Sequence, residues 1–138
     1  MKWIIFILIG FVLVAMVSIF SNPVTNDVST DNDPHYRELR PLITNSSFDE
    51  SFAICLDVAT SMPGWTITSQ DKGSGVINAT AVTTFLRFTD DVTITVTKER
   101  TGSSIHMRSK SRIGKTDFGA NARRIITYLA RVESRLKQ

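Results

Sequence analysis

Cysteine and histidine are scarce in this chain of 138 residues, and their scarcity narrows the classes of protein to consider. The one cysteine, Cys55, cannot form an intramolecular disulfide, so the fold must be stabilised by its apolar core. The two histidines, His35 and His106, stand in no H-E-x-x-H motif, and the sequence has no G-x-S-x-G, C-x-x-C or P-loop pattern. We therefore predict no metal site and no cofactor, and we assign no catalytic residue.

Charge is absent from residues 3–20, which read WIIFILIGFVLVAMVSIF. An apolar run of this length is close to the minimum that spans a bilayer as a helix. Lys2 precedes the run and Asp27 and Asp31 follow it, so the positive-inside rule places the rest of the chain on the exported side, periplasmic or extracellular. A cleaved signal peptide, which would leave the protein secreted, is the alternative, but no A-x-A pattern follows the run. We therefore favour a transmembrane anchor or uncleaved signal at residues 1–20.

Regular apolar spacing is also missing from residues 21–44, which contain three of the four prolines. Such a composition is typical of a polar, extended linker rather than of a folded segment. Residues 45–138 would then form one α+β domain, held a short distance from the membrane.

Two segments of this domain show the apolar spacing of a helix. The first begins at Ser47, which opens the capping-box sequence S-F-D-E, and Pro63-Gly64 ends it. The second begins at Thr116 or Asp117, either of which can cap it. The predicted buried faces repeat at steps of three and four, with Phe48, Phe52, Cys55, Ala59 and Met62 in the first helix and Phe118, Ala122, Ile125, Leu129, Val132 and Leu136 in the second.

Strand-forming residues fill the region between the two helices. Residues 65–69 alternate, residues 76–88 are long enough for one bent strand or two short ones, and residues 89–91 form a turn. Residues 92–96 alternate again, and a fourth strand covers residues 105–113. Tight turns make these strands antiparallel. We predict an α+β fold with an N-terminal membrane-spanning helix, then a helix, a four-stranded antiparallel sheet and a C-terminal helix, in two layers with both helices on one face.

Basic residues alternate with small or apolar ones in the last of these strands. Since alternate side chains face opposite sides of a sheet, Arg108, Lys110 and Arg112 should form one row on the face away from the helices. The charge is local, because 16 Lys and Arg residues are nearly balanced by 13 Asp and Glu. The row predicts a surface for an anionic group or an envelope protein.

The start of the C-terminal helix carries a second group of polar residues beside this row. Asp117 can cap the helix, and the backbone NH groups near Asn121 form a natural anion site. Arg123 and Arg124 follow within the next turn. These residues could converge with the basic row on one phosphate, sulfate or carboxylate.

A structural role is the alternative for the same arginines. They could pair with Asp90, Asp91 and Asp117 and so lock the corner between the strand and the helix. Whether the guanidinium groups have partners within the protein decides between a ligand site and a structural cluster.

The segment from Arg108 to Ile125, RSKSRIGKTDFGANARRI, resembles the signature of an uncharacterised family, the domain of unknown function numbered 1499. Members of that family show R-S-x-S-R-x-G-x-x-D-x-G-x-N-x-x-R-I before a final helix. They also carry an upstream F-x-D-D element, which is matched here by residues 88–91. The resemblance covers roughly residues 45–135. It implies that these residues belong together, and it supplies no activity, since none is assigned to the family.

Three functional hypotheses follow. The favoured one is a membrane-tethered, exported, non-catalytic module that binds an anionic group or a partner protein. An enzyme of unknown chemistry could instead use Asp90, Asp91 and Asp117 beside the arginines, and an assembly factor of an envelope complex could use the basic row for docking. The exported location and the lack of aromatic residues in the row argue against nucleic-acid binding.

Overall fold

The computed structural model describes residues 23–138. The predicted membrane anchor at residues 3–20 lies outside the described residues. Within residues 23–138, no helix is both long enough and apolar enough to cross a bilayer.

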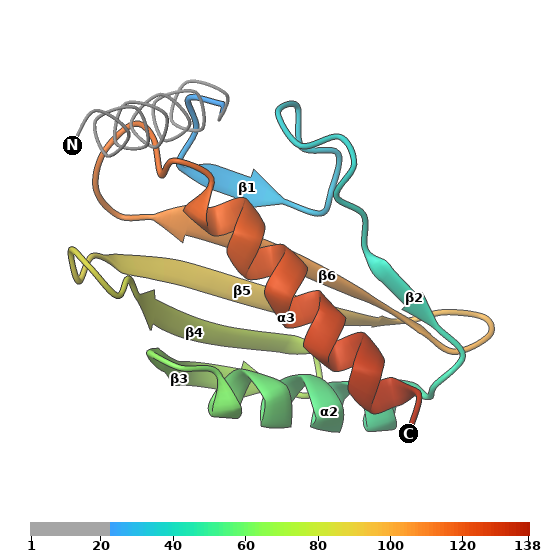
Figure 1. The fold of residues 1–138 in the computed structure, drawn as a ribbon. Coiled ribbons are helices and arrows are strands. Elements are labelled where there is room, and N and C mark those ends of the chain that lie inside the picture. Colours follow the sequence, from blue (N-terminus) through green and yellow to red (C-terminus); the bar gives the residue numbers. More distant parts are fainter. Residues whose placement is uncertain (1–22) are drawn as a thin grey trace, which may run out of the picture.

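The described chain forms one antiparallel sheet of six strands with two helices packed on the same face (Figure 1). Along the sheet the strands lie in the order β1-β6-β5-β4-β3, and β2 also pairs with β6. This arrangement confirms the predicted α+β class, the antiparallel sheet and the two-layer packing. The elements are β1 (Asp27–Ser29), β2 (Leu42–Thr44), α2 (Phe48–Ser61), β3 (Trp65–Asp71), β4 (Val76–Val82), β5 (Thr89–Lys98), β6 (Ser103–Ser111) and α3 (Ala120–Leu136).

The predicted count of four strands is wrong, because the segment that we expected to be a linker supplies two more. β1 pairs with the second half of β6, and its Val28 is fully buried. β2 pairs with the first half of β6, where Leu42 lies opposite Ile105. Strands of three residues are too short to show an alternating pattern in a sequence. The edge of β6 therefore has partners along most of its length.

The predicted turn at residues 89–91 is also wrong, since these residues begin β5. The turn lies earlier, at residues 83–88, where the backbone NH of Thr83 donates to the carbonyl of Phe88 (2.8 Å). The Phe88 NH in turn donates to the Thr83 hydroxyl (2.9 Å). The strand predicted over residues 76–88 accordingly ends at Val82.

The two helices follow the predicted apolar spacing. Ser47 caps α2 by accepting a hydrogen bond from the NH of Glu50 (3.2 Å). Tyr128 of α3 is fully buried between the layers, where its hydroxyl donates to the Cys55 carbonyl of α2 (2.8 Å). Its ring stacks on Trp65 of β3 with centroids 5.4 Å apart. Tyr128 therefore ties α3 to both α2 and the sheet, and this fixes the position of the α3 N-terminus.

One predicted core residue is not in the core. The apolar spacing predicts Phe118 on the buried face of the C-terminal helix, and this prediction is wrong because α3 begins only at Ala120. Phe118 has a positive φ of 53° and its side chain is 53% exposed. The apolar spacing continued by chance into the loop that precedes the helix.

Candidate functional site

Four polar residues of the signature, Ser109, Ser111, Asn121 and Arg124, meet at the corner where the end of β6 and the start of α3 lie side by side. Its central contact is an ion pair between Arg124 of α3 and Asp90 of β5, with Nη2 2.7 Å from Oδ2. The two side chains are only 11% and 2% exposed. A buried pair with good geometry tolerates no loss of one partner, because the remaining charge would be left without compensation.

Further hydrogen bonds extend this pair into a buried network, here defined as Asp90, Ser109, Ser111, Asn121 and Arg124. Nη1 of Arg124 donates to the Ser109 hydroxyl (2.9 Å) and to Oδ1 of Asn121 (2.7 Å). The Ser109 hydroxyl also donates to Oδ1 of Asn121 (2.6 Å), and the Asn121 amide donates to the Ser111 hydroxyl (2.9 Å). The Asn121 amide donates as well to the Asn26 carbonyl (3.2 Å), so the buried network is satisfied within the protein, as expected for polar groups away from water.

The α3 N-terminus, which we considered as an anion site, is occupied by a carboxylate of the chain itself. Asp117 accepts hydrogen bonds from the NH groups of Gly119 and Asn121, both at 2.8 Å. The residue at the N-cap position is Gly119, with a φ of 79°. Asp117 therefore caps the helix from two positions before the N-cap and not from the N-cap itself, as we predicted. This carboxylate uses the backbone donors that an external anion would need.

The arginines of the basic row are paired with aspartates on neighbouring strands. Arg108 donates to Asp27 of β1 through Nε (2.8 Å) and Nη2 (2.5 Å). Arg112 donates to Asp91 of β5 through Nη2 (2.7 Å) and Nε (3.0 Å). Hydrogen bonds from these guanidinium groups hold the pKa of both aspartates below its ordinary value. The two arginines of the row are therefore neutralised, and among the described residues Lys110 is the one member of the row without an ion-pair partner.

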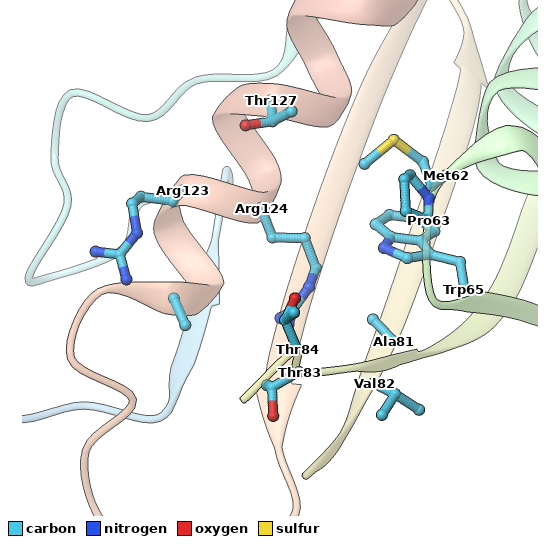
Figure 2. A pocket seen from close by; sticks show the side chains of 11 residues that line it. Met62, Pro63, Trp65, Ala81, Val82, Thr83, Thr84, Arg123, Arg124 and Thr127 are labelled. Carbon is cyan, nitrogen blue, oxygen red and sulfur yellow. The ribbon is translucent and has the colours of Figure 1, made fainter. Parts of the chain in front are cut away.

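Arg123 does not join the other arginines. It is exposed, and its Nη1 donates to the Phe118 carbonyl (3.0 Å). Arg123 and Arg124 both line a hollow of about 310 Å³ between α3 and the chain around Trp65 and Thr83, and in the view of Figure 2 the Arg123 side chain extends away from Trp65. Arg124 does reach into this hollow, but its guanidinium is already bound to Asp90. Of the two arginines at the hollow, Arg124 is thus committed to the buried network, whereas Arg123 binds a backbone carbonyl and has no carboxylate partner among the described residues.

The three carboxylates of the alternative enzyme hypothesis do not form one group, because Asp91 lies apart from Asp90 and Asp117. Asp90 is buried on the helix side of β5, whereas its neighbour Asp91 is exposed and pairs with Arg112. Asp117 is bound to the α3 N-terminus. Successive residues of a strand point to opposite faces, so Asp90 and Asp91 cannot act on one substrate from this strand.

Sequence reasoning missed an apolar cleft beside the buried network. It lies between loop 83–88, which joins β4 to β5, and loop 112–119, which joins β6 to α3, and its volume is about 420 Å³. Both loops project from the same end of the sheet, on the left in Figure 1. Its walls carry large apolar side chains, namely Phe85, Leu86, Phe88, Ile113 and Phe118.

These side chains are unusually exposed for their size. Phe85 is 96% exposed and Leu86 is 66% exposed. Of the eight large apolar residues exposed within residues 23–138, five line the apolar cleft, so they form a cluster rather than isolated surface positions. The cluster was not predictable from the sequence, because residues 83–88 have the composition of a strand and Phe118 continues the apolar spacing of the helix.

Polar residues form the inner wall of the apolar cleft. Asp90 and Ser111 of the buried network line the cleft together with Asp117, and the polar groups of all three are hydrogen-bonded within the protein. The site thus combines an apolar, open mouth with a rigid polar base. Pockets of this size and character are typical binding sites for apolar groups.

A comparison with known families agrees with the signature. A family model described as "Protein of unknown function (DUF1499)" matches residues 20–132, and this confirms the resemblance seen in residues 108–125. No curated protein matches the chain. The matched range starts before β1, so β1 and β2 belong to the same unit as the rest of the sheet.

Proposed function

Because the chain belongs to the DUF1499 family, whose function is unknown, we propose a function from the site itself: a membrane-tethered, non-catalytic binding module whose binding surface is the apolar cleft. The observation that carries the proposal is the contrast between the two halves of the site. The polar side chains of the buried network are bound to one another, whereas the apolar side chains beside them face solvent. Binding energy is therefore available from the apolar cleft and not from the buried network.

The size of the exposed cluster supports this assignment. Burying one large apolar side chain from water stabilises a contact by roughly 1.5–3 kcal/mol. Phe85 and Leu86 make no such contribution to folding, since most of their surface remains in water. A partner that covers them would gain this free energy on binding.

Recognition of an anion by the basic row has less support. An anionic ligand would have to displace Asp27 from Arg108 or Asp91 from Arg112, and both pairs have two parallel hydrogen bonds. Paired geometry of this kind is the strong form of an arginine–carboxylate contact. The enzyme alternative has less support still, because Asp91 lies on the opposite face of the sheet and Asp90 and Asp117 are hydrogen-bonded within the protein.

The tethered location rests on residues 3–20, which carry no charge over eighteen positions. We call this segment the predicted tether. A run of this kind, with a lysine before it and aspartates after it, favours an exported domain that stays at the membrane. Carbonate extraction of membranes tests the tether, because an integral segment stays in the pellet and a cleaved or peripheral protein is released.

A site-specific photo-cross-linker tests the binding surface. We would place p-benzoylphenylalanine at Phe85 in the full chain, expressed in the cells that produce it. The matched control is Ile43 of β2, which is 67% exposed and lies at the opposite end of β6. We expect adducts to lipid or protein at Phe85 and none at Ile43. Equal yields at the two positions, or no adduct at Phe85, would contradict the proposed binding surface.

A further inference from the structure

We propose that the partner of the apolar cleft is the surface of the anionic bilayer that holds the predicted tether, and that loops 83–88 and 112–119 insert their apolar side chains into it. This inference rests on the proposed function, since it assigns an occupant to the same cleft.

The first observation is the place where the chain enters the domain. The Asn26 amide donates to the Gly114 carbonyl (2.5 Å), and the NH of Asp117 donates to the Thr25 carbonyl (3.0 Å). Residues 25 and 26 are thus fastened to loop 112–119, the loop that carries Ile113 and Phe118. The entry point of the chain and the apolar cleft are at one end of the molecule.

The second observation is the short distance between the apolar run and this entry point. Phe20 ends the run and Thr25 is already bound to the domain, so only residues 21–24 lie between them. The chain from Phe20 to Thr25 therefore spans at most roughly 18 Å. The polar headgroup layer on each side of a bilayer is itself about 5–8 Å thick. The domain must therefore stand close to the membrane, with loop 112–119 among its nearest parts.

The third observation is the chemistry of the two loops. Each combines large apolar residues with an exposed cation: Arg87 stands between Leu86 and Phe88, and Lys115 follows Ile113 by two positions. Among the described residues, neither cation has an ion-pair partner. Apolar side chains with flanking basic residues are typical of surfaces that enter the boundary between headgroups and acyl chains. Anionic lipids attract the cations, and the acyl region receives the apolar side chains.

A depth measurement in vesicles tests this inference. The full chain would be reconstituted into vesicles of phosphatidylcholine with phosphatidylglycerol, and a nitroxide would be attached at Phe85→Cys, Phe118→Cys or, as the matched control, Ile43→Cys. Cys55 is fully buried and burial raises the pKa of its thiol to about 12, so the native cysteine should remain unlabelled. Relaxation by oxygen reports the lipid phase, and relaxation by a water-soluble nickel chelate reports the aqueous phase.

We expect the labels at positions 85 and 118 to be relaxed by oxygen and protected from nickel, and the label at position 43 to behave in the opposite way. Nickel access at position 85 equal to that at position 43, in a chain that resists carbonate extraction, would overturn the inference and leave the tether standing. Release of the chain by carbonate would instead show that residues 3–20 do not anchor it in the membrane. Spin–spin broadening at position 85 would identify a second copy as the occupant and would also overturn the inference.

A separate experiment tests whether Arg87, Lys115 and the anionic lipid are needed for insertion. In the Arg87→Gln, Lys115→Gln double variant, or in vesicles of phosphatidylcholine alone, the protection of position 85 from nickel should fall several-fold. Protection that is the same with and without anionic lipid would overturn the assignment to an anionic surface. The photo-cross-linking experiment gives a further distinction, because adducts to protein alone at Phe85 would support a binding surface but not a bilayer partner.

Discussion

Arg124 of α3 and Asp90 of β5 form a buried ion pair, in which Nη2 donates to Oδ2 at 2.7 Å. The pair joins the final helix to the centre of the sheet across 34 positions of sequence. The same guanidinium also binds Ser109 and Asn121, so the helix, β5 and β6 meet at one point. This relationship explains why the signature combines two serines of a strand with an asparagine and an arginine of a helix.

Replacement of Asn121 by aspartate should destabilise the fold although the two side chains have the same shape. The Asn121 amide donates to Ser111 and to the Asn26 carbonyl, and a carboxylate cannot donate to either. Leaving buried groups without a partner costs about 1–3 kcal/mol, so the free energy of unfolding should fall by at least this amount. Urea unfolding of the full chain in mild detergent measures it, and the exposed Asn45→Asp is the matched control. An unchanged midpoint for Asn121→Asp would show that the amide bonds are not needed.

Removal of the Asp117 carboxylate should weaken the start of α3. The side chain accepts from the NH groups of Gly119 and Asn121, so Asp117→Ala should cost about 1 kcal/mol. Amide hydrogen exchange at these two positions should accelerate. Thr116→Ala is the control, because the Thr116 hydroxyl accepts only the longer hydrogen bond from Phe118 (3.3 Å). Equal exchange rates in both variants would argue against the role of Asp117.

Removal of the Arg108 guanidinium should raise the pKa of Asp27 towards its ordinary value of 3.8. The hydrogen bonds from Arg108 are the largest cause of the lowered pKa, and Lys110 makes the smallest contribution, so Lys110→Gln should have less effect. Carboxyl titration by NMR measures both variants. A larger shift in Lys110→Gln than in Arg108→Gln would contradict the observed pairing.

The same pair has a consequence for acid stability. Because the folded pKa of Asp27 lies below 3.8, the pair stabilises the fold above this value, and the stabilisation is lost as the pH falls through the folded pKa. The pair is partly exposed, so its contribution at neutral pH should be at most about 1 kcal/mol. Arg108→Gln should therefore lower stability slightly at pH 7 and leave it unchanged at strongly acidic pH.

The Cys55 thiol should be unreactive in the folded protein. Burial raises its pKa to about 12, so little thiolate forms near neutral pH. A thiol reagent should label Cys55 only at the rate at which the domain opens, and urea should accelerate the labelling. Ile43→Cys, at an exposed position of β2, provides the fast reference. Rapid labelling of Cys55 without denaturant would show that the contact between α2 and α3 opens readily.

Long periodic segments were predictable from the sequence. The spacing from Phe48 to Met62 identified α2, and the spacing from Ala122 to Leu136 identified α3, because each repeats over three turns or more. Of the polar residues that the sequence singled out, Asp90, Asn121 and Arg124 meet at one corner, whereas the other arginines have different partners. The short strands β1 and β2 were missed because three residues give no period.

The pairing of charges was not predictable from the sequence. Asp90 resembled a turn residue, since aspartate is rarely buried, and the arginine that allows its burial lies on another element. The exposure of Phe85 was hidden for a related reason: a strand and an apolar loop have similar compositions. Local patterns identify elements, whereas the partners of buried charges and the faces of loops depend on the tertiary fold.

Arg124 stabilises the fold, whereas the exposed apolar side chains of loops 83–88 and 112–119 do not. Equilibrium urea unfolding of Arg124→Gln and Phe85→Ser, both in the full chain in mild detergent, tests this difference most directly. We predict that Arg124→Gln lowers the free energy of unfolding by about 3–5 kcal/mol, because it leaves Asp90 buried without a counter-charge. We predict a change within about 0.5 kcal/mol for Phe85→Ser, since Phe85 is almost fully exposed. An Arg124→Gln variant as stable as the parent protein would contradict the account.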